Sequence, residues 1–259
     1  MMIIFCVGDK MLRNTFIHLN GIGSATEKKL WRKGVKSWDD LLERGLEFLP
    51  ATRQAPVHSG VCESIRSYAA GNWDFFEQSL PSSQKWRAYN DLKDKVLFLD
   101  IETTGLTDAD SITLIGAYNG RESKIFVAGL NLEDAVAELS SYPLLVTFNG
   151  ACFDLPMIRR HFPGLAHNHI HIDLRYSLRW LGCRGGLKVI ERQFGIQRSS
   201  ATRLLDGWDA VRLWHEYRRG SQEALELLKK YNEEDVRNLK PLLETVFRQG
   251  SRKIGLVFP

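Results

Sequence analysis

One stretch of the sequence, "KVLFLDIETTG", residues 95–105, combines the pattern of a buried strand with charged side chains. It begins as an apolar strand and ends in two acids, Asp100 and Glu102. Because side chains alternate between the two faces of a strand, Val96 and Phe98 share one face with both acids. Two residues along a strand span about 6.6 Å, so two carboxylates at this spacing repel each other unless a cation compensates them. The stretch is therefore either a strand end that meets solvent or half of a metal site.

A second strand pattern also leads to an acid, in "LLVTFNGACFDLPMI", residues 144–158. The strand runs into Asn149 and Gly150, and Asp154 follows near the start of a helical pattern. One interpretation is that Asp154 is the N-cap of this helix, since Pro156 suits a first turn. Capping does not exclude a carboxylate that also reaches a metal ion.

The third motif is a long helical pattern, "ALELLKKYNEEDVRNLKPLLETV", residues 224–246, which contains a further acid. Spacings of three and four residues place one stripe on a single helix face: Leu228, Tyr231, Asp235, Leu239 and Leu242. Asp235 occupies a position where an apolar residue is expected, and a buried unpaired carboxylate costs several kcal/mol. It therefore needs a cation or hydrogen bonds, and Tyr231 lies one turn away. The alternative is a solvated acidic patch of residues 233–235.

The pattern of predicted secondary structure changes near residue 90. Helical patterns precede it at 26–35, 37–49 and 60–80, and strand patterns follow at 96–101, 112–118, 124–128, 144–148 and 169–174. Further helices are predicted at 132–142, 175–181, 186–194, 206–219 and 221–248. The sequence thus predicts an α/β domain over 91–259 and a small all-helical domain over 1–90, joined at 80–89.

Together, the three acidic motifs resemble those of the DEDD (DnaQ-type) 3′–5′ exonucleases of the RNase H-like superfamily, over residues 95–245. The spacing from Tyr231 to Asp235 resembles the tyrosine subclass. The resemblance implies a mixed five-stranded sheet with helices on both sides, and catalysis with two Mg²⁺ or Mn²⁺ ions. It implies that the metal ligands are Asp100, Glu102, Asp154 and Asp235, with Tyr231 orienting water. It also implies substrate contacts at Thr103, Thr104, Gly105, Asn149 and Phe153.

The segment 174–205 is strongly basic, with seven Lys or Arg residues against the single acid Glu191. Such a segment suits a phosphate chain, or it is a solvated basic face. Lys188 follows two glycines at the predicted start of a helix, where phosphates are favoured, so we expect it to contact a phosphate.

The N-terminal stretch "LNGIGSATEKKLWRKGV", residues 19–35, resembles half of a helix-hairpin-helix motif. In that motif the backbone of Gly21 and Gly23, with Lys28 nearby, would contact a DNA-backbone phosphate. The alternative is a hairpin that packs on the catalytic domain. The whole chain also resembles the predicted YprB-like exonucleases, which join such a helical N-terminus to the domain.

The composition of the 259-residue chain is that of a globular protein, with 44% hydrophobic and 25% charged residues and a net charge of +4. Four cysteines without paired spacing predict reduced thiols in a cytoplasmic protein. No apolar run approaches the roughly 20 residues of a membrane span. The start codon, Met1 or Met11, stays open.

We therefore expect a metal-dependent 3′–5′ exonuclease acting on nucleic acid with a 3′ end, single-stranded DNA or RNA being favoured. An RNase H-like endonuclease and a non-catalytic nucleic-acid-binding adaptor remain alternatives. The sequence does not choose between DNA and RNA.

Overall fold

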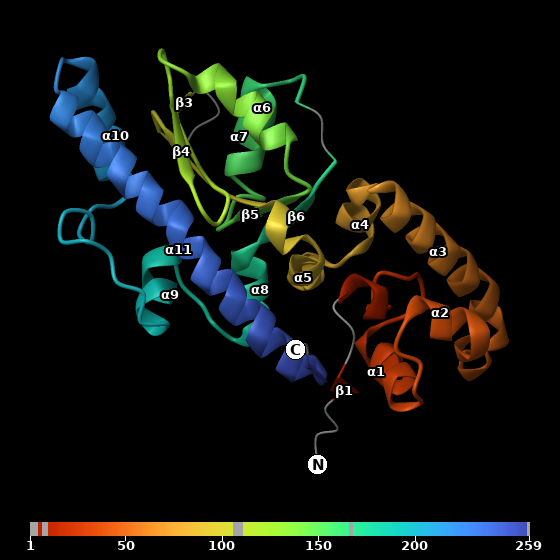
Figure 1. Cartoon of the computed structure of the whole chain (residues 1–259). Coiled ribbons are helices and arrows are strands. Elements are labelled where there is room, and N and C mark those ends of the chain that lie inside the picture. The colour runs from red at the N-terminus through yellow and green to blue at the C-terminus, as the bar shows by residue number, and fades with distance from the viewer. Residues whose placement is uncertain (1–4, 7–9, 106–110, 166–167, 258–259) are drawn as a thin grey trace.

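The computed structural model describes residues 5–6, 10–105, 111–165 and 168–257 (Figure 1). Its centre is a five-stranded sheet of β2 (Val96–Thr103), β3 (Ile112–Tyr118), β4 (Ser123–Val127), β5 (Leu144–Thr147) and β6 (Ile170–Asp173). The strand order is β4-β3-β2-β5-β6, with β3 antiparallel to both of its neighbours and β2, β5 and β6 parallel. The predicted mixed five-stranded sheet is confirmed.

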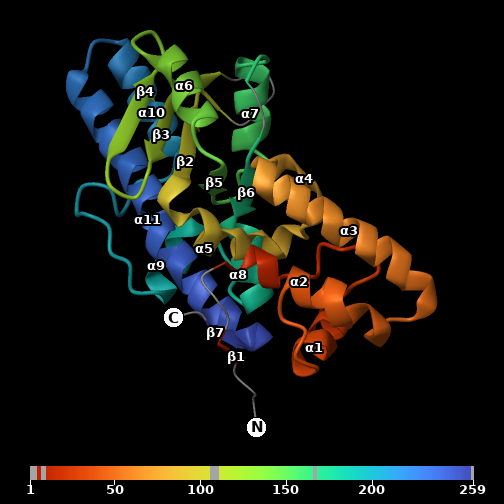
Figure 2. The ribbon, with the colours of Figure 1, turned by 45° about the vertical axis from the view of Figure 1, so that its right-hand side comes forward.

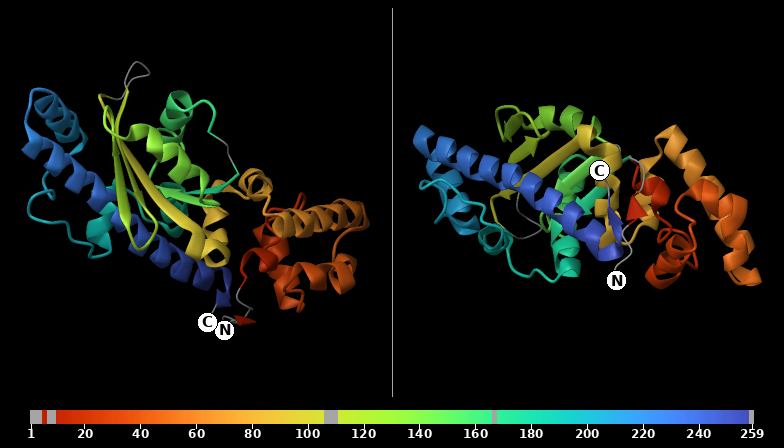
Figure 3. Two further views of the ribbon diagram at one scale, coloured as in Figure 1. Left: turned by 45° about the horizontal axis from the view of Figure 1, so that its top comes forward. Right: turned by 60° about the horizontal axis from the view of Figure 1, so that its bottom comes forward.

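Helices cover both faces of this sheet, as Figure 3 shows. The long α11 (Gln222–Ile254) crosses one face, and α6 (Ala135–Ser140) and α7 (Asp154–His161) lie on the other. Alternate residues of β2 follow this division, because Phe98 shares a core with Val236 of α11 while Leu99 shares one with Ile158 of α7. Asp100 and Glu102 have the parity of Phe98, so they face α11.

Helix α11 buries the stripe that the sequence predicts. Leu228, Leu239 and Leu242 are fully buried, and Asp235 lies among them. The helix continues through Pro241 and ends at Gly255, whose φ of +88° is left-handed. It is therefore longer than predicted. The packing of apolar residues that follow Pro241 compensates the backbone hydrogen bond that proline removes.

Three further helices frame the acid-bearing face: α8 (Leu174–Leu181), α9 (Leu187–Gln193) and α10 (Gly207–Arg218). Leu213 and Trp214 of α10 share a core with the first turns of α11, and the two helices lie side by side in Figure 1. Residues 194–206, between α9 and α10, have no regular secondary structure and pass close to Asp235.

The region before the sheet is helical, as predicted. It holds α1 (Ser24–Arg32), α2 (Trp38–Asp40), α3 (Ala51–Ala70), α4 (Trp73–Ser79) and α5 (Tyr89–Leu92). Short 3₁₀ turns lie at Leu12–Asn14, Leu46–Phe48, Ser82–Ala88, Lys93–Lys95 and Leu132–Asp134, with a π turn at Leu41–Gly45. β1 (Phe5–Cys6) pairs in parallel with β7 (Leu256–Val257) and brings the two ends of the described chain together.

Helix α3 begins nine residues before the predicted helical pattern at residue 60. Pro56 lies inside it, and a proline in a helix interior ordinarily kinks or breaks the helix. Tertiary packing decides otherwise, because Val57 and Val61 are fully buried. Gly60 also lets Leu19 approach closely, since an added Cβ would lie 3.1 Å from a Leu19 methyl carbon.

The N-terminal helices share one hydrophobic cluster with α11 (Figure 2). The segment predicted to join two domains is itself buried, and Trp86 stacks on Trp180 of α8 with ring centroids 5.8 Å apart. Gly250 of α11 makes room for this indole, since an added Cβ would lie 2.7 Å from it. The boundary at residue 90 stays a prediction. No helix within the described ranges is long and apolar enough to cross a membrane.

Candidate active site

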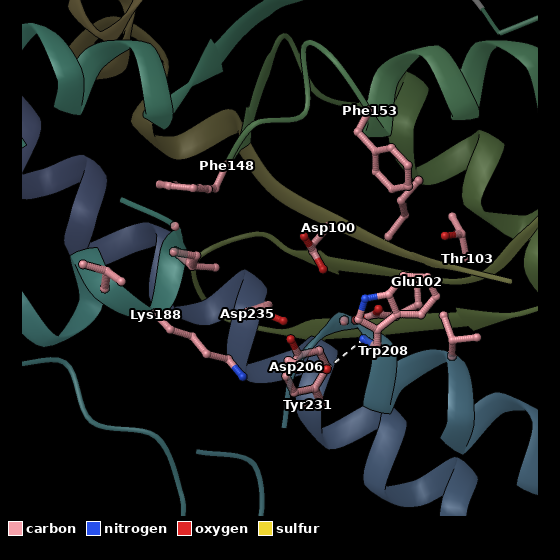
Figure 4. Close-up of a pocket in the computed structure, with 16 residues that line it drawn as sticks. Asp100, Glu102, Thr103, Phe148, Phe153, Lys188, Asp206, Trp208, Tyr231 and Asp235 are labelled. Atoms are coloured by element: carbon pink, nitrogen blue, oxygen red, sulfur yellow. Dashed lines mark hydrogen bonds between the residues drawn. The ribbon is translucent and has the colours of Figure 1, made fainter. Parts of the chain in front are cut away.

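Three acids meet where β2 faces the middle of α11. Carboxylate oxygens of Asp100, Glu102 and Asp235 all lie within 4.8 Å of one another (Figure 4). Asp100 and Glu102 come from one face of β2, and Asp235 comes from the buried stripe of α11. Oxygen ligands converging at this separation suit a hard divalent cation such as Mg²⁺ or Mn²⁺.

The surroundings of these acids disfavour their charged forms. Desolvation raises the pKa of Asp100 and of Glu102 well above their usual values, and the negative charge of Asp235 raises both further. Desolvation also raises the pKa of Asp235, to about 6, although Arg198 opposes that shift. A bound cation would remove this cost, so the donor set fits a metal ion.

Arg198 is a buried cation that pairs directly with an acid of this cluster. It donates to Asp235 and, in a bidentate pair at 2.6 and 2.7 Å, to Glu191 of α9. Its side chain is 4% exposed. The sequence interpretation counted Arg198 in a basic strip along the surface, and for this residue it was wrong. The reason is tertiary: residues 194–206 fold back so that Arg198 compensates two buried acids.

Asn232 holds the two acids of β2, and the sequence interpretation missed it. Its side-chain amide donates to Asp100 Oδ2 at 2.9 Å and to Glu102 Oε1 at 3.4 Å. The residue is fully buried. The sequence signal that could have identified Asn232 was its position directly after Tyr231. An amide that is buried beside that residue needs a polar partner.

Gly116 makes the space that Asn232 occupies. It pairs with Asp100 across the β2–β3 ladder, and an added Cβ would lie only 1.8 Å from Asn232 Oδ1. No other residue type fits this position without moving the amide. The glycine on β3 therefore sets how closely α11 approaches the acids.

Asp154 lies near the cluster but outside the group of three converging oxygens. It is the first residue of α7, and Phe153 holds the N-cap position, so the capping interpretation was wrong. Desolvation raises the pKa of Asp154 to about 7, against backbone hydrogen bonds that include one from Ile101. Its charge also raises the pKa of Asp100 and Glu102. It is electrostatically part of the site.

Asp173 holds the loop that precedes Asp154. Its carboxylate caps α8 by accepting from the Arg175 N–H. The same carboxylate accepts from the backbone N–H groups of Asn149 and Ala151, at 2.8 and 3.2 Å. One buried acid thus joins the end of β6 to the loop after β5.

A pocket of about 530 Å³ opens over the acids. Of the predicted substrate-binding residues, Thr103, Phe153 and Lys188 line it, as does Tyr231. Trp208, at the start of α10, also lines it and is 68% exposed, which is unusual for so large an aromatic side chain. Trp208 was missed because its position over the acids depends on how α10 packs on α11. Figure 4 shows it opposite Phe148, with its backbone N–H bonded to Asp206.

The remaining predicted contacts lie elsewhere. Thr104 closes a turn by accepting from the Ser111 N–H at 3.0 Å, and Gly105 accepts from the Thr103 hydroxyl. Neither Thr104 nor Gly105 lines the pocket. Asn149 lines a neighbouring cavity rather than this one. Their contact with substrate stays a prediction.

Tyr231 lies between two cations. The Lys188 Nζ is 4.9 Å and the Arg198 guanidinium 5.6 Å from its ring centroid. Burial, with the charge of Asp235, raises the pKa of Tyr231 above its ordinary value, so it is a poor base. Desolvation lowers the pKa of Lys188. Its buried Nζ has no hydrogen-bond partner among the described residues.

The "GIG" turn lies in the N-terminal region and lines neither this pocket nor the cavity beside it. Gly21 has a φ of +86°, and its carbonyl accepts from Arg53 Nη1 at 3.0 Å. Gly23 is the N-cap of α1, and Lys28 is exposed on that helix. Contact of this turn with a DNA backbone stays a prediction.

Comparison with protein families places this site in a known group. The family described as the RNase_H superfamily matches residues 97–247, more than half of the chain and all of the acids above. The chain belongs to the RNase H superfamily. Its RNase H-like domain carries the acidic cluster on β2 and α11. No curated protein matches the chain.

Solved structures similar to the RNase H-like domain are distant. One is a family B DNA polymerase from the hyperthermophilic archaeon Pyrobaculum calidifontis, at 17% identity and a TM-score of 0.46. The match covers 62% of this chain and 29% of the polymerase, so it spans under a third of that protein. A nuclease in its apo form is 20% identical, with a TM-score of 0.46 and coverage of 61% and 74%. Brucella melitensis NrnC is 21% identical, with a TM-score of 0.44 and coverage of 64% and 78%.

Proposed function

We propose that this protein is a metal-dependent 3′–5′ exonuclease that hydrolyses phosphodiester bonds at the 3′ end of single-stranded DNA or RNA. It would belong to the DEDD group, tyrosine subclass. The observation that carries the proposal is the convergence of Asp100, Glu102 and Asp235 within 4.8 Å at the base of an open pocket. No other cluster of metal-ligating side chains occurs in the part of the chain that the structure describes.

The donor set of this site suits two divalent ions. Asp100, Glu102 and Asp235 would hold one of them, and Asp100 with Asp154 would hold the second. Bound there, such ions supply an activated water and neutralise charge on the phosphate and the leaving oxygen. The raised pKa values of the four acids indicate how strongly their burial disfavours the charged carboxylates.

The other residues of the pocket position the substrate. Asn232 keeps Asp100 and Glu102 in a fixed arrangement. Tyr231, which keeps its proton, would donate a hydrogen bond that orients the attacking water. Trp208 would stack on the terminal base, since an exposed indole accepts any base face. Lys188 would meet a phosphate oxygen. Catalysis is then chiefly positioning and charge stabilisation.

The test uses purified protein with 5′-labelled single-stranded DNA and RNA, in Mg²⁺, Mn²⁺ or EDTA. We expect a ladder that shortens from the 3′ end, appears with either metal and disappears in EDTA. An Asp100→Ala variant is the control for a contaminating nuclease and should give no ladder.

Two other results would replace the proposal. Discrete internal fragments would identify an endonuclease of the same superfamily. Binding without cleavage in every metal, indistinguishable from the Asp100→Ala control, would identify a non-catalytic adaptor. If the protein does shorten the strand from its 3′ end, the relative rates on DNA and RNA of one sequence identify the substrate class.

A further inference from the structure

A second cavity lies beside the catalytic pocket. It has a volume of about 520 Å³, and Phe148 and Gly186 line both spaces. Its other walls come from α8 and the turn that follows it, from Ile190 of α9, and from Asn149 at the start of the loop after β5. We call it the arginine pocket, because Arg175, Arg179 and Arg184 line it.

The charge of the arginine pocket is uncompensated. None of the described residues that line it is acidic. Arg175 donates to the side-chain oxygen of Asn149, a neutral partner. The side chains of Arg179 and Arg184 have no hydrogen bond or ion pair to the residues that the structure describes, and both are exposed. Three cations in one concave site concentrate a positive potential that attracts an anion.

The backbone that carries this pocket is held in an unusual conformation. Asn149 has a φ of +70°, and no other described residue except glycine has a positive φ. Such a conformation is strained for a residue other than glycine, and residues of this kind cluster at functional sites. The buried carboxylate of Asp173 maintains it by accepting from the Asn149 N–H at 2.8 Å. The result is an amide side chain fixed against Arg175 at the rim of the cavity.

The two cavities differ in chemistry, and each suits a different part of a bound strand. The catalytic pocket joins metal-binding acids with the exposed indole of Trp208. The arginine pocket has guanidinium groups, which bind phosphate oxygens in a bidentate manner. Phe148 stands between them with part of its ring surface accessible to both cavities.

We propose that the arginine pocket binds the phosphates of the same strand on the 5′ side of the bond that is cut. This inference rests on the proposed function. The 3′-terminal nucleotide occupies the catalytic pocket, a base stacks on Phe148, and the preceding phosphates lie against Arg179 and Arg184. Stacking on Phe148 and Trp208 requires unpaired bases, so the substrate that fits both cavities is single-stranded.

The first experiment compares a substrate that fills only the catalytic pocket with one that fills both. The short substrate is the p-nitrophenyl ester of thymidine 5′-monophosphate, and the long one is a thymidylate octamer. KM for each is measured with wild-type protein, Arg179→Ala, Arg184→Ala and the double variant. An Arg219→Ala variant removes an exposed arginine that lines neither cavity and serves as the matched control.

We expect the ratio of the octamer KM to the ester KM to rise about tenfold for each pocket arginine removed, since a hydrogen bond to a charged group contributes about that factor. The ratio should not move with Arg219→Ala. A ratio equal to that of wild type in the double variant would overturn the arginine pocket as a strand site. An equal loss of activity on the ester and on the octamer would also overturn the arginine pocket as a strand site.

The second experiment is independent of turnover. A 5′-fluorescent thymidylate octamer is titrated with an Asp100→Asn protein at several salt concentrations, with and without the arginine substitutions. Each lost phosphate contact should reduce the slope of log K against log salt by about 0.7. If wild-type protein hydrolyses neither substrate, the proposed function fails while this titration still tests the pocket.

Free thymidine 5′-monophosphate distinguishes the remaining ligand source. If the arginine substitutions weaken binding of the mononucleotide but leave the octamer affinity and salt slope unchanged, the pocket binds free nucleotide. That result would overturn its assignment to the strand.

Discussion

Two buried arginine–carboxylate pairs show how differently this molecule treats charge in its two halves. In the N-terminal region Arg87 and Glu27 pair at 2.8 Å, and each side chain is 1% exposed. The same Glu27 oxygen accepts from the backbone N–H groups of Phe16 and Ile17, at 2.7 and 3.0 Å. One cation faces one anion that accepts two further hydrogen bonds, and both side chains are buried.

In the RNase H-like domain Arg198 faces an excess of acids. It is shared by Asp235 and Glu191, while the neutral amide of Asn232 is the only described donor to Asp100 and Glu102. One buried nitrogen of Arg198 has no hydrogen-bond partner among the described residues. A balanced buried pair maintains structure, whereas an unbalanced cluster at the base of a pocket is poised for added cations. The predictions below test this difference.

The largest expected effect is on cleavage. Asp235→Asn and Asp100→Asn each remove a ligand charge, so the rate should fall about a thousandfold or more because charge stabilisation at the phosphate is lost. Tyr231→Phe keeps every carboxylate and should lower the rate only about tenfold to a hundredfold. Initial rates on the labelled octamer measure both effects.

The matched control for the acid variants is Asp209→Asn, which changes a carboxylate of α10 that caps the helix and pairs with Arg212. It should cleave at nearly the wild-type rate. If Asp235→Asn also cleaves at nearly the wild-type rate, the excess of acids at the site does not contribute to catalysis.

The balanced pair should dominate stability instead. Glu27→Gln leaves Arg87 buried without its countercharge, so the free energy of unfolding should fall by about 3–5 kcal/mol. Glu63→Gln breaks an exposed pair with Arg66 and should cost under about 1 kcal/mol. Urea unfolding followed by circular dichroism measures both. Equal losses for the two variants would contradict the structural role given to the buried pair.

The space between Gly116 and Asn232 can be tested by a pair of substitutions. Gly116→Ala should destabilise the fold by about 1–3 kcal/mol, because the new methyl group overlaps the amide. Asn232→Ala removes that overlap, so the double variant should be more stable than the sum of the two single effects predicts.

Metal binding separates packing from function in this pair. Calorimetric titration with Mn²⁺ should show weakened binding in the double variant even where stability returns, because the donor to Asp100 and Glu102 is gone. Additive stabilities would contradict the contact. Unchanged metal affinity would contradict the positioning role of Asn232.

The smallest effect concerns pH in the absence of metal. The folded protein holds protons on Asp100, Glu102, Asp154 and Asp235 more tightly than the unfolded chain does. These acids therefore stabilise the metal-free fold below about pH 4, and that contribution is lost as the pH rises through their raised pKa values. In EDTA at pH 8, Asp100→Asn should be more stable than wild type by about 1 kcal/mol.

The sign of the stability difference between Asp100→Asn and wild type tests this prediction. At pH 4.5 it should shrink, and Mn²⁺ at pH 8 should reverse it, since only the wild type gains stability from bound metal. Urea unfolding at the two pH values measures the effect. A variant that is less stable than wild type under all of these conditions would show that repulsion among the acids is not significant.

Local sequence patterns were enough to predict the sheet, the long helix and the face on which the acids lie. Strand alternation put Asp100 and Glu102 on one side of β2, and helical spacing put Asp235 on the buried stripe of α11. These are local periodicities, so they can be recognised in the sequence without knowing what packs against each element. Resemblance to a known family added the fourth acid, Asp154, whose position depends on the loop after β5.

Which polar residues compensate those acids depends instead on contacts between distant parts of the chain. Arg198 belongs to a stretch without periodicity, and nothing local distinguishes it from its exposed neighbours. Asn232 matters because a strand 116 residues earlier has a glycine opposite it. Helix α3 forms across Pro56 because distant apolar side chains bury it. Burial and charge balance depend on residues far apart in the chain, and no single stretch of sequence contains them.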